Sequence, residues 1–217
     1  MSEVEGRRPL KVRDANLAQN FARWLSRKNI TPNQISVISV FFAALAATCL
    51  FALPHADGIS EWLLPTLAAL LIQCRLLCNL FDGMVAVEGG KSTASGELYN
   101  DIPDRIADPL ILIAIGYATT ITEWSVELGW CAGLLAVMTA YIRTLAVGMG
   151  VPPDFRGPMA KQHRMALVTV ACVATALEPR FGTQGQIFVG ALCLIVIGCV
   201  ITVYRRIRAA YNYLEKK

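Results

Sequence analysis

Carboxylate and amide side chains form two groups between residues 79 and 108, where they are available for metal or proton chemistry. Asn79 and Asp82 are three residues apart and share one helix face. The second group falls within an arc of roughly 100° on a helix that turns about 100° per residue; its members are Glu97, Asn100, Asp101, Asp104 and Asp108. Hard oxygen ligands select Mg²⁺, Mn²⁺ or Ca²⁺ over zinc. The pattern predicts a divalent-cation and phosphate site.

A helix N-terminus is the simpler alternative for the second group. Asp101 would then be the N-cap, Asp104 would stand at the third helical position, and Pro103 would oppose a continuous helix from residue 96 onward. This alternative gives Asn79 and Asp82 no role. We therefore favour the cation site, because a run of like charges on one helix face is repulsive unless something compensates it.

Basic residues near the ends of two later apolar runs are candidates for anion binding. Arg143 lies at the end of one run, and Lys161 and Arg164 precede the next. Arginine binds phosphate through two donors and lysine as a point charge, so we predict that these three side chains bind a phosphate or a headgroup. The alternative is that they anchor the helices by reaching lipid headgroups.

Membrane-spanning helices must position these side chains. Of 217 residues, 55% are hydrophobic and only 17% are charged, against about 25% charged in a soluble domain. Six apolar runs approach the ~20 residues that cross a bilayer core of about 30 Å; they cover about 35–53, 62–81, 105–122, 126–148, 164–178 and 184–204. Lipid satisfies no backbone polar group, so the runs should be helical. A partnerless Arg75 inside the second run would be expensive, so we expect it to pair with Asp108 or Glu97.

An amphipathic helix is predicted at about residues 14–28, ahead of the first apolar run. Its apolar residues recur at helical spacing, opposite Arg and Lys; they are Leu17, Phe21, Trp24 and Leu25. This pattern favours a helix lying in the membrane interface, and a solvated helix packed on the loops is the alternative. Thr31 suits an N-cap and Pro32 suits a first turn. No composition change divides the chain, so we predict one all-α membrane domain over residues 1–217.

Lysine and arginine are distributed unevenly between the two sides of the predicted bundle. They precede the first run, occupy the connections near residues 91–105 and 156–164, and follow the last run, whereas the opposite connections hold only Arg180. By the positive-inside rule, both termini and the acidic groups are cytoplasmic. We expect a multi-pass protein of the plasma (inner) membrane. The formal net charge of +4 requires no nucleic acid to explain it.

The spacing of the acidic region resembles the signature of the CDP-alcohol phosphotransferases (CDP-alcohol phosphatidyltransferases). The family pattern is D-x2-D-G-x2-A-R-x8-G-x3-D-x3-D. This chain reads Asn79-x2-Asp82-Gly83-x2-Ala86-x9-Gly96-x3-Asn100-x3-Asp104. The spacing matches at every element, but Asn79, Val87 and Asn100 stand where the family pattern has Asp, Arg and Asp.

The resemblance implies roles for the matching positions. In the family the first three aspartates hold two divalent cations, and the fourth activates the acceptor hydroxyl. Carried over, Asp82, Asn79, Asn100 and Asp104 are metal-site positions, and Asp104 is also the catalytic base. Because asparagine supplies an oxygen without charge, one Mg²⁺ or Mn²⁺ is bound instead of two, or a nearby acid substitutes; the candidates are Asp101, Glu97 and Asp108. Gly83, Ala86 and Gly96 would let the cytidine lie close to the backbone.

The implied activity is transfer of a substituted phosphate, in our interpretation a phosphatidyl group, from a CDP-linked donor to an alcohol with release of CMP. CDP-diacylglycerol is the favoured donor, the acceptor alcohol is open, and family analogy suggests a homodimer among membrane lipids. The alternative is a non-catalytic member that binds or transports a lipid or nucleotide, which the three substitutions motivate.

Overall fold

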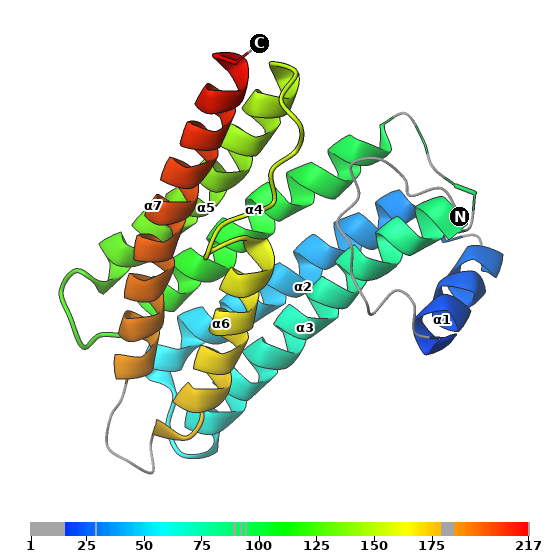
Figure 1. Ribbon diagram of the computed structural model, residues 1–217. Helices are drawn as coiled ribbons and strands as arrows, with labels where there is room; N and C mark the ends of the chain where they lie inside the picture. Colours follow the sequence, from blue (N-terminus) through cyan, green and yellow to red (C-terminus); the bar gives the residue numbers. More distant parts are fainter. Residues whose placement is uncertain are drawn as a thin grey trace.

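The computed structural model describes residues 16–28, 30–88, 90–91, 93, 95–178 and 185–216, and these residues are all-α (Figure 1). Its helices are α1 (Asn16–Arg27), α2 (Pro32–Ala52), α3 (Ile59–Glu88), α4 (Gly96–Tyr117), α5 (Ser125–Gly148), α6 (Lys161–Thr175) and α7 (Gln186–Leu214). A short 3₁₀ helix, η2 (Leu53–His55), follows α2. The predicted fold class is confirmed in this respect, and α1 lies within the predicted amphipathic segment; residues 14 and 15 of that segment fall outside the described ranges.

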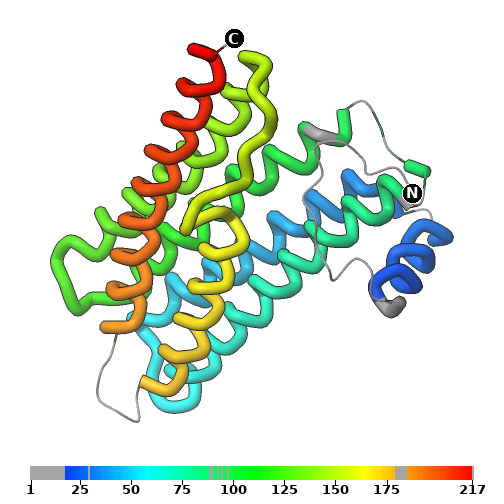
Figure 2. The backbone as a smooth tube through the Cα atoms, viewed as in Figure 1, coloured from blue at the N-terminus to red at the C-terminus, as the bar shows by residue number. Residues whose placement is uncertain are grey.

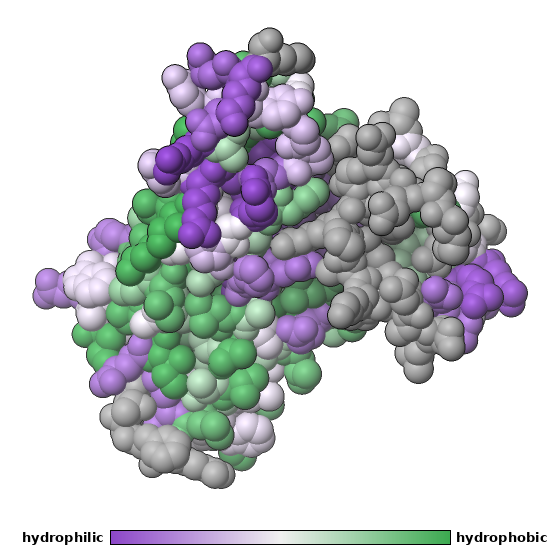
Figure 3. Space-filling view, viewed as in Figure 1, coloured by the Kyte–Doolittle hydropathy of each residue, from purple (hydrophilic) through white to green (hydrophobic). Residues whose placement is uncertain are grey.

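Four helices in the described part of the chain are long and apolar enough to cross a membrane: Pro32–His55, Ile59–Val87, Ser125–Gly148 and Gln186–Leu214. The chain is therefore a multi-pass membrane protein by the length and composition of its helices. The third and fifth predicted spans do not qualify. α4 carries too many charged side chains, and the 15 residues of α6 extend only about 22 Å at 1.5 Å per residue. Figure 3 shows hydrophobic surface around the middle of the bundle and hydrophilic residues near the C-terminal end.

Local sequence explains where α2 and α4 begin. Thr31 and Gln34 form the capping box that the sequence suggested, with the Thr31 hydroxyl accepting from the Gln34 amide and the Gln34 side chain accepting from the Thr31 amide. α4 begins at Gly96 and continues through Pro103, so the interpretation of Asp101 as an N-cap is wrong. The Asp101–Arg105 pair at 2.8 Å spans the turn that contains Pro103.

α2, α3 and α4 pack together, and α5 and α7 pack against each other and α4 (Figures 1 and 2). α6 lies against α3 and α7. One core connects these helices and includes Leu50, Ile72, Ile111, Leu192 and Phe188. The connection after α5 runs back along α7 before α6 begins (Figure 2), so the start of α6 lies deep against α4. α6 is as long as the fifth predicted run and begins three residues before it, at Lys161.

Two glycines allow α4 and α5 to approach each other closely. A Cβ added at Gly129 on α5 would lie 2.9 Å from the Gly116 Cα on α4 and 3.0 Å from the Leu112 carbonyl oxygen. Backbone cannot retreat as a flexible side chain can, and small residues are what permit such approach between membrane helices. The α4–α5 contact, which orients the acidic face of α4, thus depends on Gly116 and Gly129.

Gly129→Ala should therefore destabilise the protein by about 1–3 kcal/mol, the usual range for overpacking. The measurement is thermal unfolding of the purified protein in one detergent. Gly148→Ala, on the same helix, is the matched control, because a Cβ there meets no atom within 4 Å. Equal melting temperatures for the two variants would contradict the close-contact explanation.

Candidate active site

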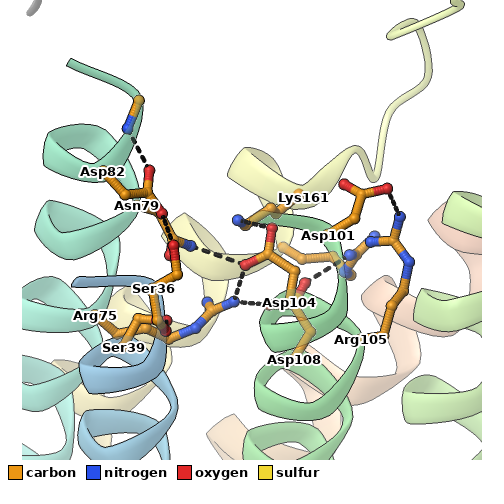
Figure 4. Close-up of polar contacts among 12 residues, drawn as sticks. Ser36, Ser39, Arg75, Asn79, Asp82, Asp101, Asp104, Arg105, Asp108 and Lys161 are labelled. Atoms are coloured by element: carbon orange, nitrogen blue, oxygen red, sulfur yellow. Dashed lines mark hydrogen bonds and ion pairs between the residues drawn. The ribbon is translucent and has the colours of Figure 1, made fainter. Parts of the chain in front are cut away.

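Asp104 of α4 lies where α3, α4 and α6 meet (Figure 4). Its Oδ1 accepts hydrogen bonds from Arg75 Nη2 at 3.0 Å and from Asn79 Nδ2 at 2.8 Å. Its Oδ2 accepts from Lys161 Nζ, at the first residue of α6. The Asp104 side chain is 9% exposed and Lys161 is 28% exposed, so Lys161 is the partner that solvent reaches.

Asp108, one turn along α4, closes a buried ion-pair network beneath Asp104. Arg75 Nη2 donates to Asp108 Oδ1 at 2.5 Å, and Arg164 Nη2 donates to Asp108 Oδ2 at 2.8 Å. Arg164 also donates through Nη1 to the Met159 carbonyl at 2.9 Å. The predicted partnership of Arg75 with Asp108 is thus present, whereas the side chain of Glu97 lies outside the described residues. Buried charges of this kind are tolerated when they are paired.

A hydrogen bond from α2 fixes the carboxylate of Asp82, which lies on α3. Ser36 Oγ donates to Asp82 Oδ2 at 2.6 Å, and the Gly83 amide donates to Oδ1. Ser39, one turn later on α2, donates to the Ser36 carbonyl at 2.6 Å. Asp82 and Asn79 lie on the face of α3 that looks toward Asp104, with Asn79 bridging between the helices (Figure 4).

Sequence reasoning assigned no role to Ser36, although a signal for it exists. Ser36 and Ser39 are polar residues three apart in the first apolar run, so they share a helix face. Both are almost fully buried. A buried hydroxyl needs a partner, and that requirement points to a polar neighbour on another helix.

The remaining acidic and amide candidates lie farther out. Asn100 is exposed. Asp101 pairs with Arg105 at 2.8 Å and with Arg143 at 3.3 Å, and the Arg143 guanidinium also lies 5.3 Å from the centre of the Phe155 ring. Asp101 is therefore neutralised by two arginines on the rim of the site, and Arg143 is directed toward that rim.

The three small residues of the predicted nucleotide-binding face are helical. Gly83 and Ala86 belong to the last turns of α3, which continues beyond the predicted end of its span, and Gly96 is the first residue of α4. A Cβ at Gly96 would meet only Thr93 Oγ1, at 3.5 Å. Packing within the described chain therefore does not require glycine at 96.

The connection between α5 and α6 sets the position of Lys161 and Arg164. Arg206 of α7 donates through Nε to the Arg156 carbonyl at 3.1 Å, and the Met159 amide donates to Thr202 Oγ1 at 3.1 Å. Partial burial opposes ionisation of Asp154, but hydrogen bonds and positive charge from Arg156 outweigh it and lower the pKa of Asp154 below its usual value. The connection is thus fastened to α7, which fixes the start of α6 beside Asp104.

The residues present do not fit a pair of divalent ions. A carboxylate offers about four acceptor positions, and Asp104 already accepts three hydrogen bonds. In the described ranges, no group of three or more His, Cys, Asp or Glu side chains is arranged to hold a metal ion. Of the seven predicted metal-site residues, Asn100 and Asp101 lie at the rim, Asp108 pairs with two arginines, and the side chain of Glu97 lies outside the described residues.

Residues 29–204 match the family model described as CDP-alcohol phosphatidyltransferase. The chain is 26% identical over 216 residues to an uncharacterized protein of Aquifex aeolicus, covering 97% of each chain. It is 24% identical over 158 residues to the inner membrane protein YnbA of Escherichia coli, covering 73% of this chain and 74% of YnbA.

The fold is similar to that of Mycobacterium tuberculosis phosphatidylinositol phosphate synthase PgsA1. The structure of PgsA1 with CDP-DAG bound gives a TM-score of 0.75 at 20% identity, covering 91% of this chain and 94% of PgsA1. The structure of PgsA1 in complex with manganese and citrate gives a TM-score of 0.71 at 19% identity, covering 89% and 88%.

Proposed function

Because this chain belongs to the CDP-alcohol phosphatidyltransferase family, we propose that it is a membrane enzyme of phospholipid synthesis that transfers a phosphatidyl group from a CDP-linked donor to an alcohol. The observation that carries the proposal is Asp104, a carboxylate at the junction of three helices with Asp82 across from it and cations around it. The bound CDP-DAG of PgsA1 supports a CDP-linked lipid as donor.

In the proposed reaction the acceptor oxygen attacks the donor phosphorus that carries the lipid. The bond from that phosphorus to the bridging oxygen breaks, and CMP leaves. Asp104 Oδ2 takes the hydroxyl proton, which requires it to come within hydrogen-bond reach of the acceptor. Lys161, the exposed partner of Oδ2, would turn toward the phosphate oxygens and free that oxygen for the proton. Positioning and charge stabilisation supply most of the rate in phosphoryl transfer.

The basic residues proposed from the sequence to bind substrate differ in how exposed their side chains are. Arg164 is buried between Asp108 and the Met159 carbonyl, so it forms a fixed wall of the site. Lys161 and Arg143 are each more than a quarter exposed and are the residues we propose to contact a phosphate or headgroup. Gly83, Ala86 and Gly96 would flank the cytidine.

The proposed function includes one divalent metal ion. A single Mg²⁺ or Mn²⁺ would bind, at Asp82 and Asn79; the manganese complex of PgsA1 supports a divalent ion in this fold.

We propose that the chain crosses the membrane six times as one domain, with the short α6 and the charged α4 crossing inside the bundle. The active site and both termini would face the cytoplasm in an inner membrane, as a homodimer.

The purified protein in detergent, given CDP-diacylglycerol and Mg²⁺ or Mn²⁺, should release CMP once the right acceptor alcohol is added. The reason is that the acceptor hydroxyl then lies between Asp104 and the donor phosphorus that it attacks. Chromatography of the nucleotide products measures the release, and omission of the acceptor is the control. Absence of CMP across glycerol phosphate, inositol phosphate and serine would contradict the proposal.

A second function, ligand binding without turnover, is favoured by the three donors on Asp104. These donors occupy both oxygens of Asp104, so that neither is free to take a proton until a donor moves away. The two functions separate when CDP-diacylglycerol binding and CMP release are measured on the same sample. Binding without release, for every acceptor tried, would establish the second function.

A further inference from the structure

The charges of the site balance without any added ion. Three carboxylates face the junction of α3, α4 and α6, namely Asp82, Asp104 and Asp108. Three cations contact two of them: Arg75 and Arg164 from below, and Lys161 from the solvent side. Two divalent ions placed here would add four positive charges to a site that has no uncompensated negative charge. Excess charge removed from water is expensive.

The buried polar atoms that lack a partner at this site are donors. Within the described residues, Arg75 Nε, Arg75 Nη1 and Arg164 Nε are buried and contact no acceptor. A buried donor calls for an oxygen atom, from water or from a ligand. A metal ion needs acceptor atoms instead, so these unsatisfied atoms indicate capacity for an anion rather than for cations.

Lys161 is easier for an incoming ion to displace than either of the two arginines. Arg75 is completely buried and Arg164 nearly so, and each is fixed by its contacts with Asp108. Lys161 holds only the outer oxygen of Asp104 and reaches it from a 28% exposed position. An ion approaching Asp104 from solvent would have to displace Lys161 first.

We propose that Lys161 is the resident countercharge of Asp104 and takes the place of one of two divalent ions, so that the site binds one Mn²⁺ or Mg²⁺, at Asp82 and Asn79. Asn79 and Asn100 agree with this proposal. They stand where the family pattern has carboxylates, so the site carries two fewer negative charges for a second ion to neutralise. The inference refines the metal content of the proposed function, but ion binding decides it independently of turnover.

Electron paramagnetic resonance of Mn²⁺ titrated into the purified full-length protein tests the proposal. The wild-type protein should bind one ion. Lys161→Met should bind one Mn²⁺ ion more than the wild type, because Asp104 loses the cation that takes the place of that ion. Lys161→Arg, which keeps the charge, should resemble the wild type. Lys28→Met is the matched control, since Lys28 is exposed at the end of α1, and its loss should leave the number of bound Mn²⁺ ions unchanged.

Two wild-type Mn²⁺ ions, or a Lys161→Met variant that binds no more Mn²⁺ ions than the wild type, would overturn the proposal. Size-exclusion chromatography and thermal unfolding show whether each variant is folded. Lys161→Gln, which keeps a polar group, replaces Lys161→Met if the latter does not fold, and the wild-type ion count decides the matter by itself. Failure to release CMP with one bound ion would count against the proposed function and not against this inference.

Discussion

Asp104→Asn is expected to lower the rate of CMP release by about 10²–10⁴-fold, the usual contribution of a general base, while the protein still binds CDP-diacylglycerol. The amide keeps one oxygen for the hydrogen bonds from Arg75 and Asn79. It has no oxygen basic enough to take the acceptor proton. The effect should therefore appear in kcat, with donor binding close to that of the wild type.

Asp57→Asn is the matched control for that measurement. It makes the same chemical change at an exposed position in the turn before α3, at the other end of that helix from Asp82. Its turnover should equal that of the wild type. If Asp104→Asn also turned over at the wild-type rate, Asp104 could not be the base, and the proton would have to pass to another group or to water.

Much of the fold was predictable because its signals are local. The capping residues Thr31 and Gln34 stand beside the helix they begin, and the apolar face of α1 is visible in a 12-residue window. The failures involve tertiary contacts. α4 continues through Pro103 and packs against α2 and α5, and α6 begins at Lys161, before the predicted run, because the preceding connection is fastened to α7. Neither effect is visible in hydrophobicity alone.

The sequence indicated which acidic and amide residues lie near one another, but it did not indicate all of the cations that contact them. Spacing placed Asn79, Asp82 and Asp104 in one region, and Asn79 does reach Asp104. The prediction of a metal ion on the acidic face of α4 did not include Lys161 as a partner of Asp104. Arg75 and Lys161 are 29 and 57 positions from Asp104 along the chain, and only folding brings them together. Charge patterns within one helix therefore do not show which cations from other helices neutralise it.

Arg75→Met should destabilise the protein more than any other single change discussed above, by about 3–5 kcal/mol, the usual effect of removing one member of a buried ion pair. Arg75 is completely buried and contacts both Asp104 and Asp108 through one nitrogen. Methionine fills similar space but leaves two carboxylates that share the remaining cations. Thermal unfolding in detergent would report the loss as a lower melting temperature.

Arg143→Met is the matched comparison, because it removes an arginine from a pair that is 26% and 33% exposed. Pairs of that kind contribute about 0–1 kcal/mol, so the variant should melt near the wild type. The double variant Arg75→Met with Asp108→Asn separates charge from packing: it removes a carboxylate together with its cation, so it should recover part of the lost stability. If the double variant were less stable than Arg75→Met alone, the arginine would stabilise the core through its packing, and the buried charge balance would not be what holds α3 against α4.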